Sequence, residues 1–365
     1  MIFLPCFHPL IGVDVGIRSP EGKPLYQIKH FPEDLRPGID LRVKYAPYDQ
    51  SRFVPCGPNE GFSYVTIPCG KCIGCRLESS RQWANRCLLE LEYHDSAYFV
   101  TLTYDDYHVP ISYYPDPETG EAQPSLTLCK RDVQLFMKRL RDRFRDQEIR
   151  FFMCGEYGPN TFRPHYHLIL FGLSLPDLQY VGDIRGHRYY SSQLLERCWS
   201  RKGVMQNLFG EECVTPLAKI GNVTIEDVTW ETCAYTARYI TKKLTGPAAK
   251  FYSDFNIEPP FVNMSRRPGI ARQWYEDHPN MRDFEYINIK TAAGGKKFRP
   301  PKYYDKIFDG EFPEESARIK AIRQKMCLES IRAKLERTDL NYIEYLAVEE
   351  NKLKSRTKSL KREDV

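Results

Sequence analysis

The middle of the chain alternates between short apolar runs and segments whose apolar residues recur at helical spacing. The runs at 97–104, 151–158 and 163–172 are rich in aromatic and β-branched residues, which is typical of strands. The residues between the last two runs have the composition of a turn, so we expect an antiparallel hairpin there. Residues 77–93 and 130–145 place their apolar side chains on one face of a helix, and both are predicted helices.

A third helix is predicted over residues 231–244, with Thr229 positioned to cap its start. Tyr235 and Tyr239 are then one turn apart on the same face. Lys242 lies seven residues beyond Tyr235 and returns to nearly the same side of the helix. Two phenols and an ammonium group therefore share one stripe. Ordinary core packing is the alternative interpretation of such a tyrosine pair.

The predicted hairpin brings a candidate metal-binding set together. His165 and His167 share one face of a strand because successive side chains point to opposite faces, and Tyr166 between them points the other way. Glu156, at the end of the preceding strand, comes opposite the histidines. Two imidazoles and a carboxylate with open positions suit Mg²⁺ or Mn²⁺ shared with a phosphate. The alternative is a pair of ordinary polar positions on a half-buried strand.

A cysteine-rich segment forms a second candidate metal site. Three cysteines follow the pattern Cys-x2-Cys-x2-Cys, and a fourth precedes them in a similar Pro-Cys-Gly setting. The candidate ligands of a structural zinc ion are Cys56, Cys69, Cys72 and Cys75. Cys87 or His94 are alternatives for the fourth ligand. Reduced cysteines without a metal, or an iron–sulfur cluster, are the other interpretations.

Three of these motifs, in this order, resemble those of the His-hydrophobe-His endonucleases, most closely the rolling-circle replication initiators of microviruses of the gokushovirus type. The resemblance covers roughly residues 65–245. Residues 99–104 resemble the first motif, a strand flanking the site. His165-Tyr166-His167 resembles the second, the metal-binding motif, with Glu156 where related initiators place a third ligand. Residues 235–243 resemble the third, a helix with two nucleophilic tyrosines and a following lysine.

The resemblance implies a fold and a function. The fold is α+β, with an antiparallel sheet of about five strands, ferredoxin-like or RRM-like, and helices on one face. The function is nicking of a circular phage origin by Tyr235 or Tyr239, assisted by Lys242, to give a 5′-phosphotyrosine adduct and a free 3′ hydroxyl that primes rolling-circle replication. The strand is later rejoined. A relaxase or transposase, and a non-catalytic zinc-containing nucleic-acid-binding protein, are the alternatives.

Composition adds limits to this picture. The 365 residues include 53 Lys and Arg against 48 Asp and Glu, so the net charge is only +5 and any charge that binds DNA must be local. The twelve cysteines come without a secretory signal, and no apolar run approaches the length of a membrane span. We therefore expect reduced cysteines, no membrane partner and a location in the cytoplasm of a bacterial host.

The chain is expected to have four parts: an irregular N-terminal extension at 1–64, the endonuclease domain at 65–245, a loop-rich aromatic and basic region at 246–312, and a helical basic tail at 313–365. The basic face of the helix at 130–145 is either solvated or follows a DNA backbone. No Gly-x4-Gly-Lys-Ser/Thr loop occurs. The expected partners are therefore single-stranded origin DNA and a host helicase and polymerase.

Overall fold

The structure is a computed structural model that describes residues 6–20, 24–30, 64–184, 186–206, 212–238, 244, 246–283, 286–291 and 294–357. The chain divides into two compact units. The larger runs from Ser79 to Pro301, and the smaller combines residues up to Glu78 with those from Lys302 onwards. Each unit is described by itself.

The larger unit is built on one antiparallel sheet, which among the described residues has seven strands. In spatial order these are β14 (Phe261–Met264), β7 (Arg150–Tyr157), β8 (Pro164–Phe171), β4 (Ala97–Thr103), β13 (Val223–Asp227), β10 (His187–Ser191) and β9 (Gln179–Ile184). The helices of this unit are most of α1 (Ile73–Leu91), then α2 (Lys130–Arg143), α3 (Gln193–Cys198), α4 (Trp230–Arg238), α5 (Lys250–Asp254) and α6 (Arg272–Asp277).

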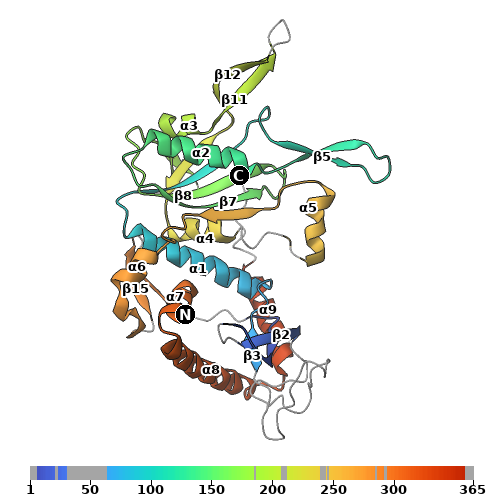
Figure 1. Ribbon diagram of the computed structural model, residues 1–365, viewed down its shortest axis with the longest axis vertical. Helices are drawn as coiled ribbons and strands as arrows, with labels where there is room; N and C mark the ends of the chain where they lie inside the picture. The colour runs from blue at the N-terminus through green and yellow to red at the C-terminus, as the bar shows by residue number, and fades with distance from the viewer. Residues whose placement is uncertain are drawn as a thin grey trace. The chain divides into compact units, whose positions relative to one another are not determined.

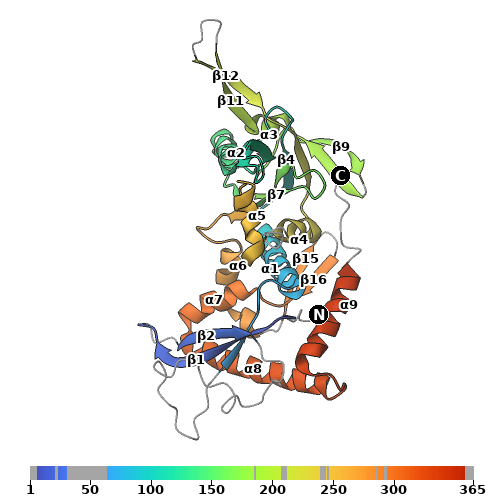
Figure 2. The same cartoon turned by 90° about the vertical axis from the view of Figure 1, so that its right-hand side faces the viewer.

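Three two-stranded hairpins complete the larger unit. They pair β5 (Ile111–Pro115) with β6 (Ala122–Leu126), β11 (Ser200–Gln206) with β12 (Glu212–Lys219), and β15 (Ile287–Thr291) with β16 (Gly294–Phe298). The β11–β12 hairpin extends away from the sheet in both views (Figures 1 and 2).

The antiparallel α+β class is confirmed, but two details of the expected sheet are wrong. The described residues form seven strands, not about five. Helices cover both faces, with α2 and α3 on one side and α1 and α4 on the other (Figure 1). The reason lies in β7 and β8, whose residues are buried almost throughout. A strand covered on one side only would expose every second residue, so these two strands need cover on both faces.

The main hydrophobic core lies between α2 and the sheet. It joins Phe136 and Leu140 of α2 to Leu168 and Leu170 of β8, and all four side chains are fully buried. Trp199, which follows α3, closes the same core. The apolar spacing that predicted a helix at 130–145 therefore marks the face that packs on the sheet.

Tyr166, between the two histidines, points into this core as the sequence predicts. Its hydroxyl accepts a hydrogen bond from the backbone N–H of Cys129 (2.8 Å) and lies 3.0 Å from the hydroxyl of Tyr104, which contacts Asp132 at 2.9 Å. Burial raises the pKa of both phenols above the ordinary value of tyrosine. Both phenols are therefore neutral at pH 7, and their role is structural.

The opposite face of the sheet is covered by α1 and α4. The ring of Trp83 on α1 stacks on Phe152 of β7, with 4.9 Å between ring centroids. Ser80 Oγ, one α1 turn earlier, donates a 2.7 Å hydrogen bond to the backbone carbonyl of Ala234 on α4. α1 thus packs on the sheet and at the same time positions α4.

Gly221 lies against the main chain at the end of β4, just before β13 begins. A Cβ added to it would fall 1.8 Å from the carbonyl oxygen of Thr103, which is backbone and cannot swing aside. We expect Gly221→Ala to lower the free energy of unfolding by about 3 kcal/mol or more, as measured by urea denaturation. Gly295→Ala is the matched control, because nothing lies within 4 Å of its added Cβ. A loss below about 1 kcal/mol at Gly221 would contradict this packing.

The smaller unit contains a three-stranded antiparallel sheet. β1 (Leu10–Arg18) pairs with both β2 (Pro24–His30) and β3 (Tyr64–Ile67). Figure 2 shows β1 and β2 in blue. Two strands therefore lie in the segment that we expected to be irregular. Glycines at positions 12 and 16 interrupt the apolar pattern of β1, which explains why this segment carries no clear strand signal.

The C-terminal part is helical, as expected, but it is not one long helix. It forms α7 (Lys302–Glu311), α8 (Pro313–Leu335) and α9 (Tyr342–Thr357). The side chain of Asn341 accepts hydrogen bonds from the N–H groups of Ile343 and Glu344, and this cap starts α9. α9 is also not simply exposed, since it buries Leu346. No helix of the described residues has both the length and the apolar character needed to cross a bilayer.

Candidate active site

The hairpin of β7 and β8 is formed as predicted and sets the register of the candidate metal ligands. Glu156 lies directly opposite His165 across the ladder, and Cys154 lies opposite His167. On the other side of β8, Thr101 of β4 lies opposite His167. Because every second residue shares a face, the two histidines, Glu156 and Thr101 all lie on the sheet face that α1 and α4 cover.

The three candidate ligands converge on one point. The Nε2 atoms of His165 and His167 lie 3.0 Å and 3.1 Å from the same carboxylate oxygen of Glu156. One donor atom from each residue falls within 4.8 Å of the others. The structure thus brings together the Glu156, His165 and His167 that the sequence singled out.

The hydrogen bonds at Nδ1 indicate which tautomer of His165 is present. Its Nδ1 lies 3.2 Å from the backbone carbonyl of Arg163, which can only accept, so Nδ1 carries a proton. In the neutral imidazole the lone pair is then on Nε2 and faces the Glu156 carboxylate. Two electron-rich atoms at 3.0 Å require a positive charge between them. A proton or a metal ion at this point satisfies both, so the donor set fits a divalent cation.

The environment of Glu156 keeps its carboxyl group ionised. Burial alone would raise its pKa, but the hydrogen bonds and positive charge of the two imidazoles outweigh burial and lower the pKa to about 2. A carboxylate that is ionised at neutral pH and almost fully buried is a suitable ligand for a cation.

His167 is held in place by two residues of β4 that the sequence analysis did not single out. Its Nδ1 lies 3.0 Å from Thr101 Oγ1, and its ring stacks on Phe99 with 5.5 Å between centroids and 9° between planes. Phe99 is buried, so the imidazole has a rigid support. Polar Thr101 within an otherwise apolar strand was the sequence signal that marked this partner.

The helix that carries the tyrosines begins as predicted. The side chain of Thr229 accepts a 3.2 Å hydrogen bond from the N–H of Thr232, and the side chain of Thr232 accepts one from the N–H of Thr229 (2.9 Å). This reciprocal cap starts α4 at Trp230. Tyr239 and Lys242, which we expected on the same helix, lie outside the described residues.

Tyr235 lies next to the candidate metal ligands. Its half-buried ring packs edge-on against His167, with 5.1 Å between centroids, and against Phe99 at 6.3 Å. The guanidinium of Arg238 lies 5.8 Å from the centre of the Tyr235 ring. Sequence analysis missed Arg238 because it looked for the cation at Lys242. A phenol, a guanidinium and a cation-binding set together can hold a phosphodiester and attack it.

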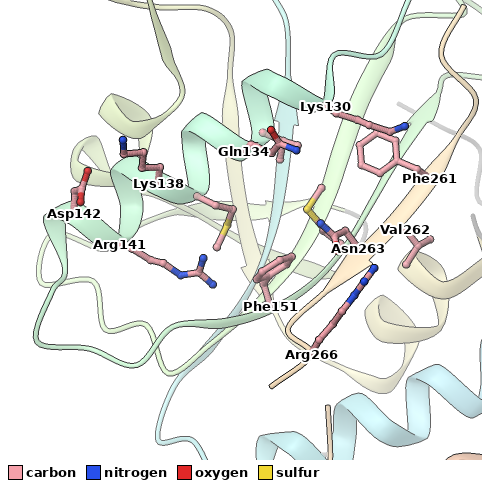
Figure 3. Close-up of a pocket in the computed structure, with 13 residues that line it drawn as sticks. Lys130, Gln134, Lys138, Arg141, Asp142, Phe151, Phe261, Val262, Asn263 and Arg266 are labelled. Carbon is pink, nitrogen blue, oxygen red and sulfur yellow. The ribbon is translucent and has the colours of Figure 1, made fainter. Parts of the chain in front are cut away.

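A cationic groove of about 700 Å³ lies on the other face of the sheet, between α2 and the edge strand β14. Figure 3 shows the basic side chains of α2 beside Phe151 and Arg266. The residues that give it this character are Lys130, Lys138, Arg141, Arg266, Phe151 and Phe261. Phe151 alternates with Phe152 along β7, so the groove is on the face opposite Glu156. The basic side of α2 is thus partly arranged around aromatic rings.

Four cysteines cluster in the smaller unit, but not with the fourth member that we expected. The sulfur atoms of Cys6, Cys69, Cys72 and Cys75 lie within 4.8 Å of one another. Cys56, the expected fourth ligand, lies outside the described residues. The alternatives for that position belong elsewhere, because Cys87 is buried beside Cys233 and the ring of His94 contacts Glu90. Sequence analysis missed Cys6 because 63 positions separate it from Cys69.

Comparisons with known proteins agree with this geometry. A family model described as replication-associated protein, of the ORF2 type, matches residues 97–244. The chain is 30% identical over 304 residues to the replication-associated protein ORF2 of Spiroplasma virus 4, which covers 81% of this chain and 85% of that protein. It is 28% identical over 259 residues to the replication-associated protein VP4 of Bdellovibrio phage phiMH2K, covering 68% and 69% of the two chains. No solved structure matches.

Proposed function

Because the chain belongs to the ORF2 family of replication-associated proteins, we propose that it initiates rolling-circle replication by nicking the origin of a circular phage DNA. One observation supports this most strongly. The ring of Tyr235 lies 5.1 Å from the ring of His167, whose Nε2 faces the Glu156 carboxylate together with that of His165. A nucleophile and a cation-binding set therefore share one pocket.

In the proposed reaction the phenol oxygen of Tyr235 attacks the phosphorus of the scissile phosphodiester, and the bond from phosphorus to the 3′ oxygen breaks. The phenol loses its proton and the leaving 3′ oxygen gains one. The 5′ end stays on the protein as a phosphotyrosine ester. A Mg²⁺ or Mn²⁺ ion held by Glu156, His165 and His167 would offset the charge that develops on the phosphate oxygens.

The ester explains how one protein both opens and closes a strand. It conserves the energy of the broken bond, so the strand can be rejoined without ATP, while the free 3′ hydroxyl primes synthesis. A second tyrosine lets one phenol hold the 5′ end while the other cuts the regenerated origin. Tyr239 in this role, and Lys242 as the cation beside the attacking oxygen, stay predictions from the sequence.

The test is a covalent adduct between the protein and its DNA. We expect the purified protein, incubated with cognate circular single-stranded DNA and Mn²⁺, to yield a complex that survives denaturation. Mass spectrometry of the digested complex should find the attached nucleotide on a tyrosine of residues 235–239. Tight binding without an adduct in either Mn²⁺ or Mg²⁺ would overturn the proposal and would favour a non-catalytic DNA-binding protein.

The partners follow from what the reaction leaves undone. The sequence contains no Gly-x4-Gly-Lys-Ser/Thr phosphate loop, so strand separation is not assigned to this chain by any motor motif. We propose that a host helicase separates the strands and that a host polymerase extends the 3′ end released at the origin.

The groove beside α2 is proposed to bind DNA that flanks the nick. Lys138 and Arg266 supply positive charge beside the ring of Phe151, which suits the phosphates and bases of a single strand. We expect the double variant Lys138→Glu/Arg266→Glu to weaken binding of origin single strand about ten-fold and to reduce the salt dependence of binding. Fluorescence anisotropy at several salt concentrations measures both.

The matched control for the groove is Arg131→Glu, which makes the same kind of charge change on an exposed residue of α2 outside the groove. It should weaken binding less than the groove variant does. Because the groove lies on the sheet face opposite Glu156, cleavage at saturating DNA should stay near wild type in the groove variant. Equal losses in the two variants would show that only overall charge matters.

A further inference from the structure

We propose that Cys6, Cys69, Cys72 and Cys75 bind one structural zinc ion. Four thiolates are a common donor set of closed, tetrahedral zinc sites. With zinc–sulfur bonds of about 2.3 Å, the sulfur atoms of such a site lie roughly 3.8 Å apart. In this chain all four sulfurs lie within 4.8 Å of one another, and those of Cys69 and Cys75 are 4.0 Å apart. This arrangement is close to what the ion requires.

Backbone N–H groups point at three of the sulfurs. Cys69 Sγ accepts from the N–H groups of Lys71 (3.4 Å) and Cys72 (3.3 Å), Cys72 Sγ from those of Phe7 (3.3 Å) and Cys75 (3.5 Å), and Cys6 Sγ from that of Cys69 (3.2 Å). Such donors stabilise negative charge on sulfur. The loop is shaped for a thiolate cluster.

The turn between the first two sulfurs depends on a glycine. Gly70 has a φ of +72°, a backbone conformation that residues with a Cβ rarely adopt. This conformation leaves the N–H groups of Lys71 and Cys72 free to point back at Cys69 Sγ. Glycine is therefore required at this point of the Cys-x2-Cys turn.

The surroundings argue against a disulfide or a set of solvated thiols. Cys69 and Cys75 are separated by 4.0 Å between sulfurs, about twice the length of an S–S bond, which is roughly 2.05 Å. Cys72 is buried in a small core with Phe7, Tyr342 and Leu346, and the other three cysteines pack against that core. Zinc would neutralise charge that this apolar environment otherwise disfavours.

The ion would join parts of the smaller unit that are distant in sequence. Cys6 precedes β1, the other three cysteines surround the start of α1, and Tyr342 and Leu346 belong to α9. His8 adds a 3.0 Å contact to Glu350 of the same helix. We infer that zinc holds the N-terminal strands, the start of α1 and α9 as one folded unit, independently of the proposed nicking reaction.

The experiment is a zinc measurement on a chain whose proposed nicking site cannot bind metal. The full-length variant His165→Ala/His167→Ala is purified without chelator, and bound metals are measured by inductively coupled plasma and native mass spectrometry. We expect about one zinc ion per chain. Adding Cys6→Ser or Cys72→Ser should lower this content at least five-fold, roughly. Cys56→Ser and Cys327→Ser should leave it unchanged.

A second readout covers the case in which a cysteine variant does not fold. The unsubstituted cysteines, reconstituted with Co²⁺, should give the visible bands and sulfur-to-metal charge transfer of a tetrahedral thiolate site. Chelation should accelerate amide exchange in β1 and α9 and leave β7 and β8 unchanged. Zinc far below one ion per chain with no such Co²⁺ spectrum, iron with inorganic sulfide in its place, or zinc lost in Cys56→Ser but kept in Cys6→Ser would each overturn the proposal.

Discussion

Replacing His167 with alanine is expected to lower the rate of metal-dependent strand cleavage by about 10³-fold, which corresponds to roughly 4 kcal/mol of transition-state stabilisation. The change removes one of the two imidazole nitrogens that face Glu156 and also the ring that packs against Tyr235. It therefore affects both the cation and the placement of the nucleophile. Cleavage of origin DNA under single-turnover conditions measures the rate, and Mn²⁺ titration followed by electron paramagnetic resonance measures the affinity.

The conservative comparison for this prediction is Thr101→Val. It removes only the hydroxyl that lies 3.0 Å from His167 Nδ1 and keeps the shape of the side chain. A partner that orients a metal ligand contributes about 10- to 100-fold to affinity or activity, so the expected loss is smaller than for His167→Ala. A His167→Ala variant that folds, binds Mn²⁺ as the wild type does and still cleaves would contradict the metal site.

Replacing both Tyr235 and Tyr239 with phenylalanine is expected to abolish the covalent adduct with origin DNA. Each change removes one oxygen, and the ring of Tyr235 would keep its contacts with His167 and Phe99, so the fold and DNA binding should persist. Tyr235→Phe alone should lower adduct formation at least ten-fold, roughly, with the residual adduct on Tyr239. Denaturing gel electrophoresis of labelled DNA measures the adduct.

Tyr107→Phe provides the control, because Tyr107 is 96% exposed. It should form adduct at the wild-type rate. An adduct that survives in the Tyr235→Phe/Tyr239→Phe variant would remove the tyrosine assignment while leaving the metal site in place. The two predictions can therefore fail separately.

The sequence was sufficient to predict the part of the site that depends on local pairing. A turn-like segment between two apolar runs predicted the hairpin, and the hairpin placed Glu156 opposite His165. Strand alternation predicted that His165 and His167 share a face and that Tyr166 points into the core. These inferences succeeded because short connections and a two-residue period leave few alternatives.

The parts that sequence reasoning missed depend on contacts between distant segments. Cys6 joins the cysteine cluster across 63 positions, and no local pattern marks it. β14 pairs with β7 at the edge of the sheet although its four residues lie in a region that looked like loops. The second layer of helices had a signal that was not used, namely the almost continuous apolar character of β7 and β8.

The metal ligands and the nucleophile are carried by elements of different stiffness. Glu156, His165 and His167 belong to strands paired on both sides by main-chain hydrogen bonds, and such a ladder yields only as a whole. Tyr235 belongs to a short helix whose described contacts with the sheet and α1 are made by side chains. The phenol can therefore shift with its attached strand of DNA while the ligands stay fixed, as a protein that cuts, holds and rejoins one strand requires.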